Sequence, residues 1–203
     1  PGVLMNTDSL DDKAPNYVAA IATGADASFG LAYLEVSTGD FRVTGLRGEA
    51  ELLSELNRVE PREVLVEQVG KSESGQEGVP KPLEALEGRL DGVFFRPRAA
   101  RSFASKELLE RIAAGPRLAE DLVGDAYFLE SAAVEKVFAR IHEFDFENAE
   151  PVSKAASAVL DYLIETRRGV PANIQAVEPY RARSFLVIDE STKANLELTR
   201  TLM

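Results

Sequence analysis

Three apolar segments of strand length follow one another closely near the start of the chain, and they constrain the fold more than any other feature of the sequence. These segments are residues 17–23, 29–37 and 41–44, joined by the short turns 24–27 and 38–39. Connections of this length join neighbouring antiparallel strands, since a parallel crossover needs a dozen or more residues. The chain is therefore expected to begin its fold with a three-stranded antiparallel meander.

Side chains alternate between the two faces of these expected strands. In the second segment, one face carries Phe29, Leu31, Tyr33 and Glu35, and the other carries Ala32, Leu34 and Val36. Four aromatic residues recur at strand spacing, namely Tyr17, Phe29, Tyr33 and Phe41. Aromatic side chains in strands are typical of a packed core. We therefore interpret these four as core residues and not as a platform on which nucleic-acid bases stack.

The remainder of the chain alternates between helical and strand patterns. Expected helices cover residues 49–59, 106–114, 130–142 and 152–166, and expected strands cover 63–67, 93–95 and 185–188. The run 63–67 is apolar between two glutamates, which is typical of a buried parallel strand. Residues 70–82 are rich in glycine, serine, lysine and glutamate and are expected to form an exposed loop. Residues 172–183 are expected to be extended.

This order of elements predicts an α/β fold with one mixed sheet flanked by helices. A three-stranded meander followed by alternating helices and strands is similar to the order of the ribonuclease H-like fold. The chain opens at Pro1 without an initiator methionine, and the helical pattern after Asp189 is still running at Met203. We therefore expect a piece of a longer protein, with a last helix that frays near Met203.

Composition narrows the classes of function. The 203 residues carry a net charge of −11, whereas surfaces that bind nucleic-acid backbones are usually basic. The arginines that could form a local basic patch are Arg96, Arg98, Arg101, Arg167, Arg168, Arg181 and Arg183. We expect these side chains to be solvated or ion-paired. The sequence has no cysteine, no signal peptide and no apolar run long enough to cross a bilayer, so a cytoplasmic location without a membrane partner is expected.

Three carboxylates raise the alternative of a divalent-metal-dependent nuclease of the ribonuclease H type. Such enzymes hold two cations with about three or four clustered carboxylates, and the candidates are Glu35, Asp40 and Glu67. Glu35 is one acid within an apolar strand, Asp40 occupies a turn where aspartate is common, and the strand 93–95 carries no acid. We therefore expect no metal site. The alternative predicts cleavage with Mg²⁺ or Mn²⁺ that is lost on Glu35→Ala.

Other catalytic signatures are missing from the sequence. His142 is the single histidine and lies at the end of an expected helix, where a cation interacts favourably with the helix dipole. The sequence has no Gly-x-Ser-x-Gly elbow, no P-loop and no Gly-x-Gly-x-x-Gly motif. We nominate no catalytic or cofactor-binding residue. Another hypothesis is a small-molecule-binding α/β domain, which requires a sheet-edge pocket with convergent polar groups.

Four groups of residues, in the same order along the chain, resemble the MutS family of DNA mismatch-recognition proteins. They lie between residues 1 and 21, 29 and 41, 61 and 65, and 160 and 198. The most specific patterns are Ser-Thr-Gly-Asp-Phe at 37–41 and Asp-x-x-Thr-x-x-Asn-Leu-Glu at 189–197. The resemblance covers nearly the whole chain except residues 70–125.

The resemblance implies a connector domain for residues 1–176, with a ribonuclease H-like fold that has no nuclease activity. Residues 177–203 would be the strand and helix that begin the next domain, the lever. The mismatch-reading motif of the family would precede Pro1, and its P-loop ATPase would follow Met203. ATP and Mg²⁺ are therefore implied as cofactors of the parent protein only, and this chain is not expected to be an enzyme. Mismatched DNA is implied as a partner of the parent, which would associate with the bacterial nucleoid.

The resemblance further implies a coupling role between the mismatch-binding and ATPase ends of a MutS protein, and a docking surface for MutL. The helix 130–142 matches the region that the family uses for docking. Its apolar side carries Val134, Val137, Phe138 and Ile141, and its outward side carries Glu135 and Lys136. Glu135 and Lys136 are the candidate partner-binding residues, with an ordinary solvated helix face as the alternative.

Overall fold

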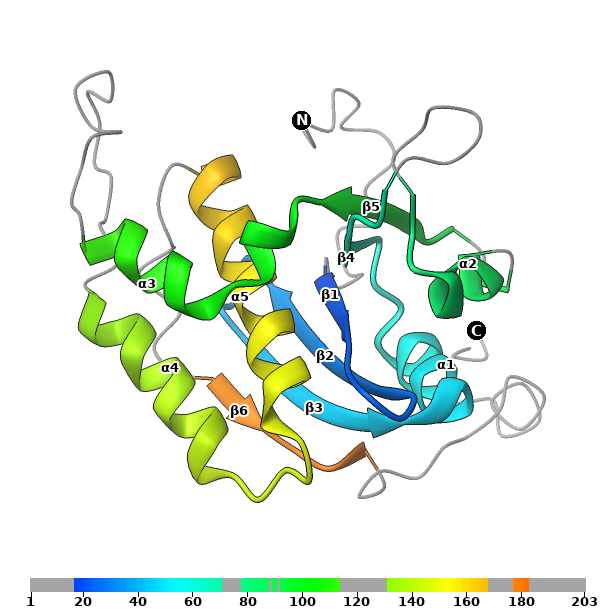
Figure 1. Cartoon of the computed structure of the whole chain (residues 1–203), viewed down its shortest axis with the longest axis horizontal. Helices are drawn as coiled ribbons and strands as arrows, with labels where there is room; N and C mark the ends of the chain where they lie inside the picture. The colour runs from blue at the N-terminus through cyan, green and yellow to red at the C-terminus, as the bar shows by residue number, and fades with distance from the viewer. Residues whose placement is uncertain are drawn as a thin grey trace, which may run out of the picture.

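A computed structural model places six strands in one mixed sheet that is flanked by helices (Figure 1). It describes residues 17–70, 78–87, 89–90, 92–113, 131–167 and 177–182. The strands are β1 (Tyr17–Thr23), β2 (Ser28–Glu35), β3 (Phe41–Arg47), β4 (Glu63–Glu67), β5 (Phe94–Arg98) and β6 (Val177–Pro179). The helices are α1 (Gly48–Val59), α2 (Lys81–Glu87), η2 (Ala100–Phe103), α3 (Ser105–Ala113), α4 (Ser131–Glu143) and α5 (Ala149–Arg167).

The predicted antiparallel meander is confirmed, and the sheet extends it on both sides in the order β5-β4-β1-β2-β3-β6. β2 pairs antiparallel with β1 and β3, whereas β4, β5 and β6 join by parallel pairing. The turn between β1 and β2 has φ of 54° at both Asp26 and Ala27, as in the type I′ turns that suit twisted hairpins. The turn before β3 has φ of 79° at Gly39, a conformation that glycine adopts without a steric cost.

Each face of the sheet has its own apolar core. On one face α5 lies across β1 and β2, with α3, α4 and η2 packed beside it (Figure 1). On the other face, leucines of α1 and α2 cover the sheet. The alternation predicted for β2 is confirmed, because Ala32 and Leu34 belong to the first core and Leu31 and Tyr33 to the second. Of the four predicted aromatic core residues, Phe29, Tyr33 and Phe41 are buried and Tyr17 is half-buried.

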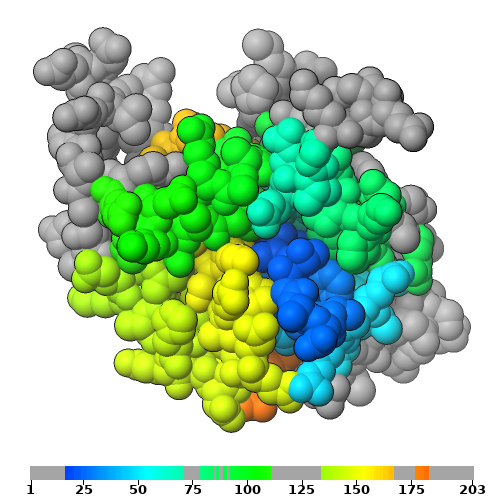
Figure 2. Space-filling view, viewed as in Figure 1, coloured from blue at the N-terminus to red at the C-terminus, as the bar shows by residue number. Residues whose placement is uncertain are grey.

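Helix α5 comes unusually close to the sheet because small residues form the contact. Ala155, Ala156 and Ala158 on the helix are fully buried. On β2, a Cβ atom added to Gly30 would lie 2.1 Å from the carbonyl carbon and oxygen of Pro151, at the start of α5. On the face drawn in Figure 2, the yellow segment of α5 lies between the yellow-green segment of α4 and the blue N-terminal part of the meander. The sheet and this helix therefore form one tightly packed body.

Several predicted bounds require correction, since the strand expected over 41–44 continues to Arg47 and the helix expected over 152–166 begins at Ala149. The loop expected over residues 70–82 is wrong for Lys81 and Pro82, which begin α2. Leu83 and Leu86 of this helix are fully buried, so tertiary burial stabilises a helix at the end of a segment of loop-like composition. The strand expected over 93–95 instead runs from Phe94 to Arg98, because five residues pair in register with β4.

The chain returns to the sheet within the stretch 172–183, which was predicted to be extended. Val177–Pro179 pairs parallel with β3 and forms β6 at the edge of the sheet. The boundary placed after residue 176 stays a prediction. The strand predicted at 185–188, the helix after it and the predicted fraying at Met203 lie outside the described residues. Within the described ranges, none of the helices combines the length and apolar character needed to cross a bilayer.

Candidate functional site

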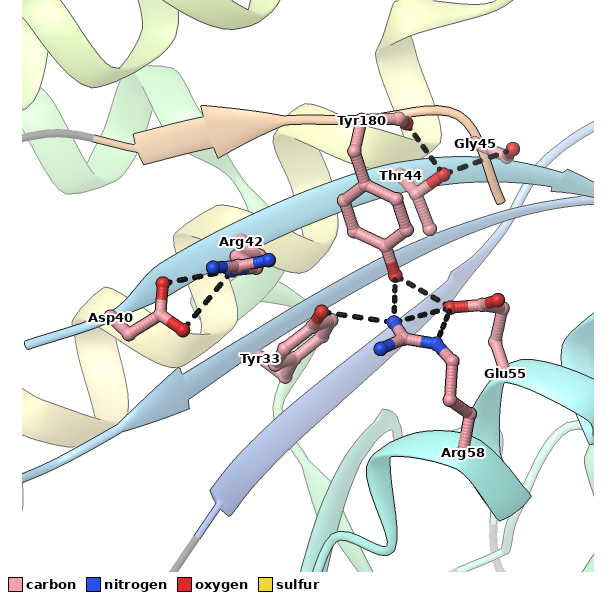
Figure 3. Close-up of polar contacts among 8 residues, drawn as sticks. All are labelled: Tyr33, Asp40, Arg42, Thr44, Gly45, Glu55, Arg58 and Tyr180. Carbon is pink, nitrogen blue, oxygen red and sulfur yellow. Dashed lines mark hydrogen bonds and ion pairs between the residues drawn. The ribbon is translucent and has the colours of Figure 1, made fainter. Parts of the chain in front are cut away.

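A cluster of charged and phenolic groups lies between α1 and the meander (Figure 3). Its centre is the carboxylate of Glu55, which is 2% exposed and accepts hydrogen bonds from the guanidinium of Arg58 at 2.7 and 3.1 Å. The hydroxyl of Tyr180 donates to the same carboxylate oxygen at 2.7 Å. Arg58 also donates to the hydroxyl oxygens of Tyr33 and Tyr180, both at 3.0 Å. Residues from β2, α1 and the segment after β6 thus share one polar network.

The surroundings of Arg58 and Tyr180 in this cluster keep both side chains protonated. Burial alone would lower the pKa of Arg58, but its hydrogen bonds to Glu55 and Tyr33 outweigh burial and raise that pKa above the usual value. Burial is also the main reason why the pKa of Tyr180 is raised, followed by the neighbouring Tyr33 and Glu55. At neutral pH, Arg58 is therefore a cation and Tyr180 a hydrogen-bond donor. The cluster is suited to holding three segments together.

A second pair of charges borders this cluster. Arg42 on β3 donates to the carboxylate of Asp40 at 2.9 and 3.1 Å and lies 3.6 Å from the carboxylate of Glu178 on β6. The hydrogen bond to Asp40 is the main cause that raises the pKa of Arg42. A polar pocket of about 160 Å³ lies between the Glu55 cluster and Arg42. It is lined by Tyr17, Tyr33, Asp40, Arg42, Arg58 and Val59.

The sequence analysis missed Glu55, Arg58 and Tyr180 as a group. One signal was present, because Glu55 lies on the same helical face as Leu52, Leu56 and Val59, which are buried in α1. An acid within an apolar stripe needs a buried partner. The hydrogen bond from Tyr180 to Glu55 could not be predicted, since 125 residues separate the two in the sequence.

Three arginines of the predicted basic patch are ion-paired, as expected for this set. Arg96 on β5 pairs with Glu63, and Arg98 pairs with Glu165 and lies 3.7 Å from the buried Asp161 of α5. Arg181 pairs with Asp145 at 3.0 Å. Arg101 is exposed, and Arg168 and Arg183 lie outside the described residues, as does the side chain of Arg167. The contacts of Arg98 connect the edge strand β5 to α5, and the pair of Arg96 with Glu63 connects β5 to β4.

Tyr162 of α5 belongs to the same edge network. Its hydroxyl donates to Glu63 at 2.8 Å, and its ring lies 5.8 Å from the guanidinium carbon of Arg98. Burial, together with the hydrogen bond to Glu63, raises the pKa of Tyr162 to about 12. The phenol is therefore protonated at neutral pH and fixes the start of β4 against α5.

Two of the three carboxylates considered for a nuclease, Glu35 and Asp40, are engaged in local structure, and Glu67 is half-buried at the end of β4. Glu35 is buried and accepts from the Ser37 hydroxyl at 2.8 Å and from the backbone N–H of Thr38 at 2.5 Å, while Asp40 pairs with Arg42. Over the described ranges, no three His, Asp or Glu residues gather in a way that could hold a metal ion. The arrangement thus gives no support to the nuclease alternative, and Glu35 stabilises the turn before β3.

Glu35→Gln is expected to lower the free energy of unfolding by about 1–2 kcal/mol at pH 7, because the turn loses charge-assisted hydrogen bonds. Burial would raise the pKa of Glu35, but the bonds from Thr38 and Ser37 outweigh it and hold the pKa below its usual value. A lowered pKa in the folded state means that the stabilisation is present above the unfolded-state pKa of about 4.3 and is lost as the pH falls through the folded-state value. Urea unfolding of both proteins between pH 7 and pH 3 checks this, and a difference that stays constant across that range would contradict it.

The candidate partner-binding residues lie where the sequence predicted. Glu135 and Lys136 are exposed on α4, and the opposite side of that helix is buried through Val134, Val137, Phe138 and Ile141. His142 is exposed near the end of α4. The geometry makes the outward face of α4 accessible, while its use by a partner stays a prediction.

A groove of about 670 Å³ lies at the far end of the meander. Its lining residues are Ala25, Asp26, Ser28, Phe29, Gly45, Leu46, Arg47, Glu51, Asp145, Phe146, Glu147, Asn148, Tyr180, Arg181 and Ala182. Charged side chains pair with one another across it, since Arg47 pairs with Glu147 and Arg181 with Asp145. Such ion pairs are typical of a contact between two segments of a chain. A small-molecule site would instead have polar groups that converge on the ligand.

Comparison with known proteins gives a consistent result along the chain. The family described as MutS domain II matches residues 16–115. DNA mismatch repair proteins MutS from Thermosynechococcus vestitus and Myxococcus xanthus are each 30% identical over the whole chain, and MutS from Symbiobacterium thermophilum is 31% identical. The chain spans about a fifth of the length of these relatives (21%, 20% and 20%). Because the similarity extends from end to end and the domain match covers the meander, α1, β4, β5 and α3, the chain belongs to the MutS family of DNA mismatch repair proteins and carries its domain II.

Proposed function

We propose that this chain is the non-catalytic connector of a MutS protein, which couples the mismatch-binding end to the ATPase end. The match to MutS domain II is the observation that carries the proposal. A coupling element must move as one body, since its state can then be biased by ligands at either end. The tight contact between α5 and the sheet, together with the ion pairs between β5 and α5, supports such a stiff body.

We also propose that the fold is ribonuclease H-like. The five strands β3-β2-β1-β4-β5 form an antiparallel meander continued by parallel strands, with helices on both faces, and this arrangement supports the assignment. Catalysis would reside elsewhere in the parent protein, where ATP and Mg²⁺ would bind. Contact with mismatched DNA would likewise be made mainly by other domains, because the chain carries a net charge of −11.

MutL is the proposed partner of the outward face of α4. Glu135 and Lys136 are exposed there, next to each other and of opposite charge. Exposed charges at the edge of an interface mainly set orientation and association rate. Their contribution to docking is therefore expected to be moderate and sensitive to salt.

Reversing both charges (Glu135→Lys with Lys136→Glu) is expected to weaken binding of the MutL N-terminal domain about fivefold, since complementary charges become repulsive. Titration of the ¹⁵N-labelled chain, followed by NMR, measures the dissociation constant and locates the contact. The matched control reverses Lys106 and Glu107, an exposed pair of the same composition on α3, and should leave binding unchanged. Equal weakening by both variants would move the contact away from α4, and no binding by the unmodified chain would refute docking.

A further inference from the structure

The segment that follows β6 is held on both sides of the sheet by two consecutive residues. The side chain of Tyr180 reaches Glu55 and Arg58 of α1, and the side chain of Arg181 reaches the loop between α4 and α5. We propose that Tyr180 and Arg181 form a two-sided clamp that couples the position of residues 180–182 to α1 on one side and to the end of α4 on the other. This inference goes beyond the coupling role proposed above, and it does not depend on MutL docking.

Tyr180 is bound to α1 through its side chain and to β3 through its backbone. Its hydroxyl donates to the buried carboxylate of Glu55 at 2.7 Å, and its ring lies edge-on to that of Tyr33, with 6.1 Å between the ring centroids. Its backbone N–H donates to the carbonyl of Val43 at 3.0 Å, and its carbonyl accepts from the hydroxyl of Thr44 at 2.9 Å. Figure 3 shows the Tyr180 carbonyl bonded to Thr44 of β3 and its hydroxyl bonded to Glu55 and Arg58 of α1.

The hold on the opposite side comes from Arg181. Its guanidinium donates to the backbone carbonyl of Asp145 at 2.9 Å and to the carboxylate of the same residue at 3.0 Å. It also lies 5.8 Å from the ring centroid of Phe144, which immediately follows α4. The position of Arg181 is therefore tied to the end of α4, the helix whose outer face carries Glu135 and Lys136.

The strand that precedes the clamp is short. β6 has only three residues, and its last residue, Pro179, has no backbone N–H to donate to a neighbouring strand. Short edge strands open readily unless other contacts hold them. Because Tyr180 and Arg181 follow β6 directly, a shift of α1 or α4 must either carry the segment along or break one side of the clamp.

Hydrogen exchange at the backbone N–H of Tyr180 tests the clamp, because this group bonds to Val43 and exchanges only when the segment opens. Tyr180→Phe removes a hydrogen bond to a buried charge and should accelerate exchange about tenfold. Arg181→Gln removes an exposed ion pair and should accelerate it about threefold. If both contacts must break for opening, the double variant should exchange about thirtyfold faster, the product of the two effects.

Matched controls separate the clamp from a general loss of stability. Tyr162→Phe removes a phenol bonded to a carboxylate at the other sheet edge, and Arg140→Gln removes an exposed pair within α4. Both should leave exchange at Tyr180 within about twofold of the unmodified chain. Unchanged exchange in Arg181→Gln would show that the two sides open separately and would overturn the proposal, as would equal acceleration by the controls.

Discussion

Gly30→Ala is expected to lower the free energy of unfolding by about 3 kcal/mol or more, or to prevent native packing altogether. The added Cβ would lie 2.1 Å from the carbonyl of Pro151 and 2.4 Å from the backbone nitrogen of Val152. These are main-chain atoms of α5, so no side-chain rotation can relieve the overlap. The helix would have to move away from β2 and open the core beneath it. Urea unfolding followed by circular dichroism measures the loss.

Gly45→Ala is the matched control for this substitution. Gly45 lies on β3 directly opposite Gly30 in the sheet register, and its added Cβ would meet only side-chain atoms at ordinary contact distances of 3.5 and 3.6 Å. Alanine also loses less backbone entropy than glycine in a strand. Stability should therefore change by less than about 1 kcal/mol. Equal losses of unfolding free energy in the two variants would show that the close approach of α5 does not require glycine at position 30.

Glu55→Gln is expected to destabilise the chain by about 2–3 kcal/mol, the second-largest effect among the substitutions considered. The neutral amide keeps the volume of the side chain but leaves the guanidinium of Arg58 without its buried counter-charge. Partial exposure of Arg58 lets water recover some of that loss, so the effect should fall short of a fully buried pair. Thermal and urea unfolding at neutral pH measure the change.

Glu49→Gln on the same helix is the control for charge removal. Glu49 also pairs with an arginine, Arg89, but both side chains are about half exposed. Its loss should cost less than about 0.5 kcal/mol. A double variant, Glu55→Gln with Arg58→Met, should be more stable than Glu55→Gln alone, because no unpaired charge remains. Failure of this rescue would indicate that Arg58 is not stabilised by its charge partner.

Local patterns were sufficient to predict most elements of the fold. Residues 17–44 contain three apolar segments of strand length joined by short turns, and both features act between neighbours in the sequence, so the meander could be predicted. The apolar stripe of α4 likewise predicted its buried side. The prediction was wrong at Lys81 and Pro82, where burial of Leu83 and Leu86 outweighs a loop-like composition.

The candidate site could be predicted only in part. The exposure of Glu135 and Lys136 follows from helical periodicity, which fixes which side chains oppose the apolar stripe. The Glu55 cluster did not follow from periodicity, because its members come from β2, α1 and the segment after β6. The spacing of residues in the sequence does not indicate that the phenol of Tyr180 bonds to the buried carboxylate of Glu55.

By itself, the sequence determined the family, the antiparallel meander and the amphipathic helices, because each of these depends on residue order or on contacts between near neighbours. Only the tertiary structure decided how close α5 lies to the sheet and how the segment after β6 is held. The first depends on the absence of a side chain at Gly30 beneath Pro151, and the second on Tyr180 reaching Glu55 across 125 residues of sequence. Such contacts arise only when the sheet brings remote segments together, since steric fit and charge pairing act through space and not along the chain.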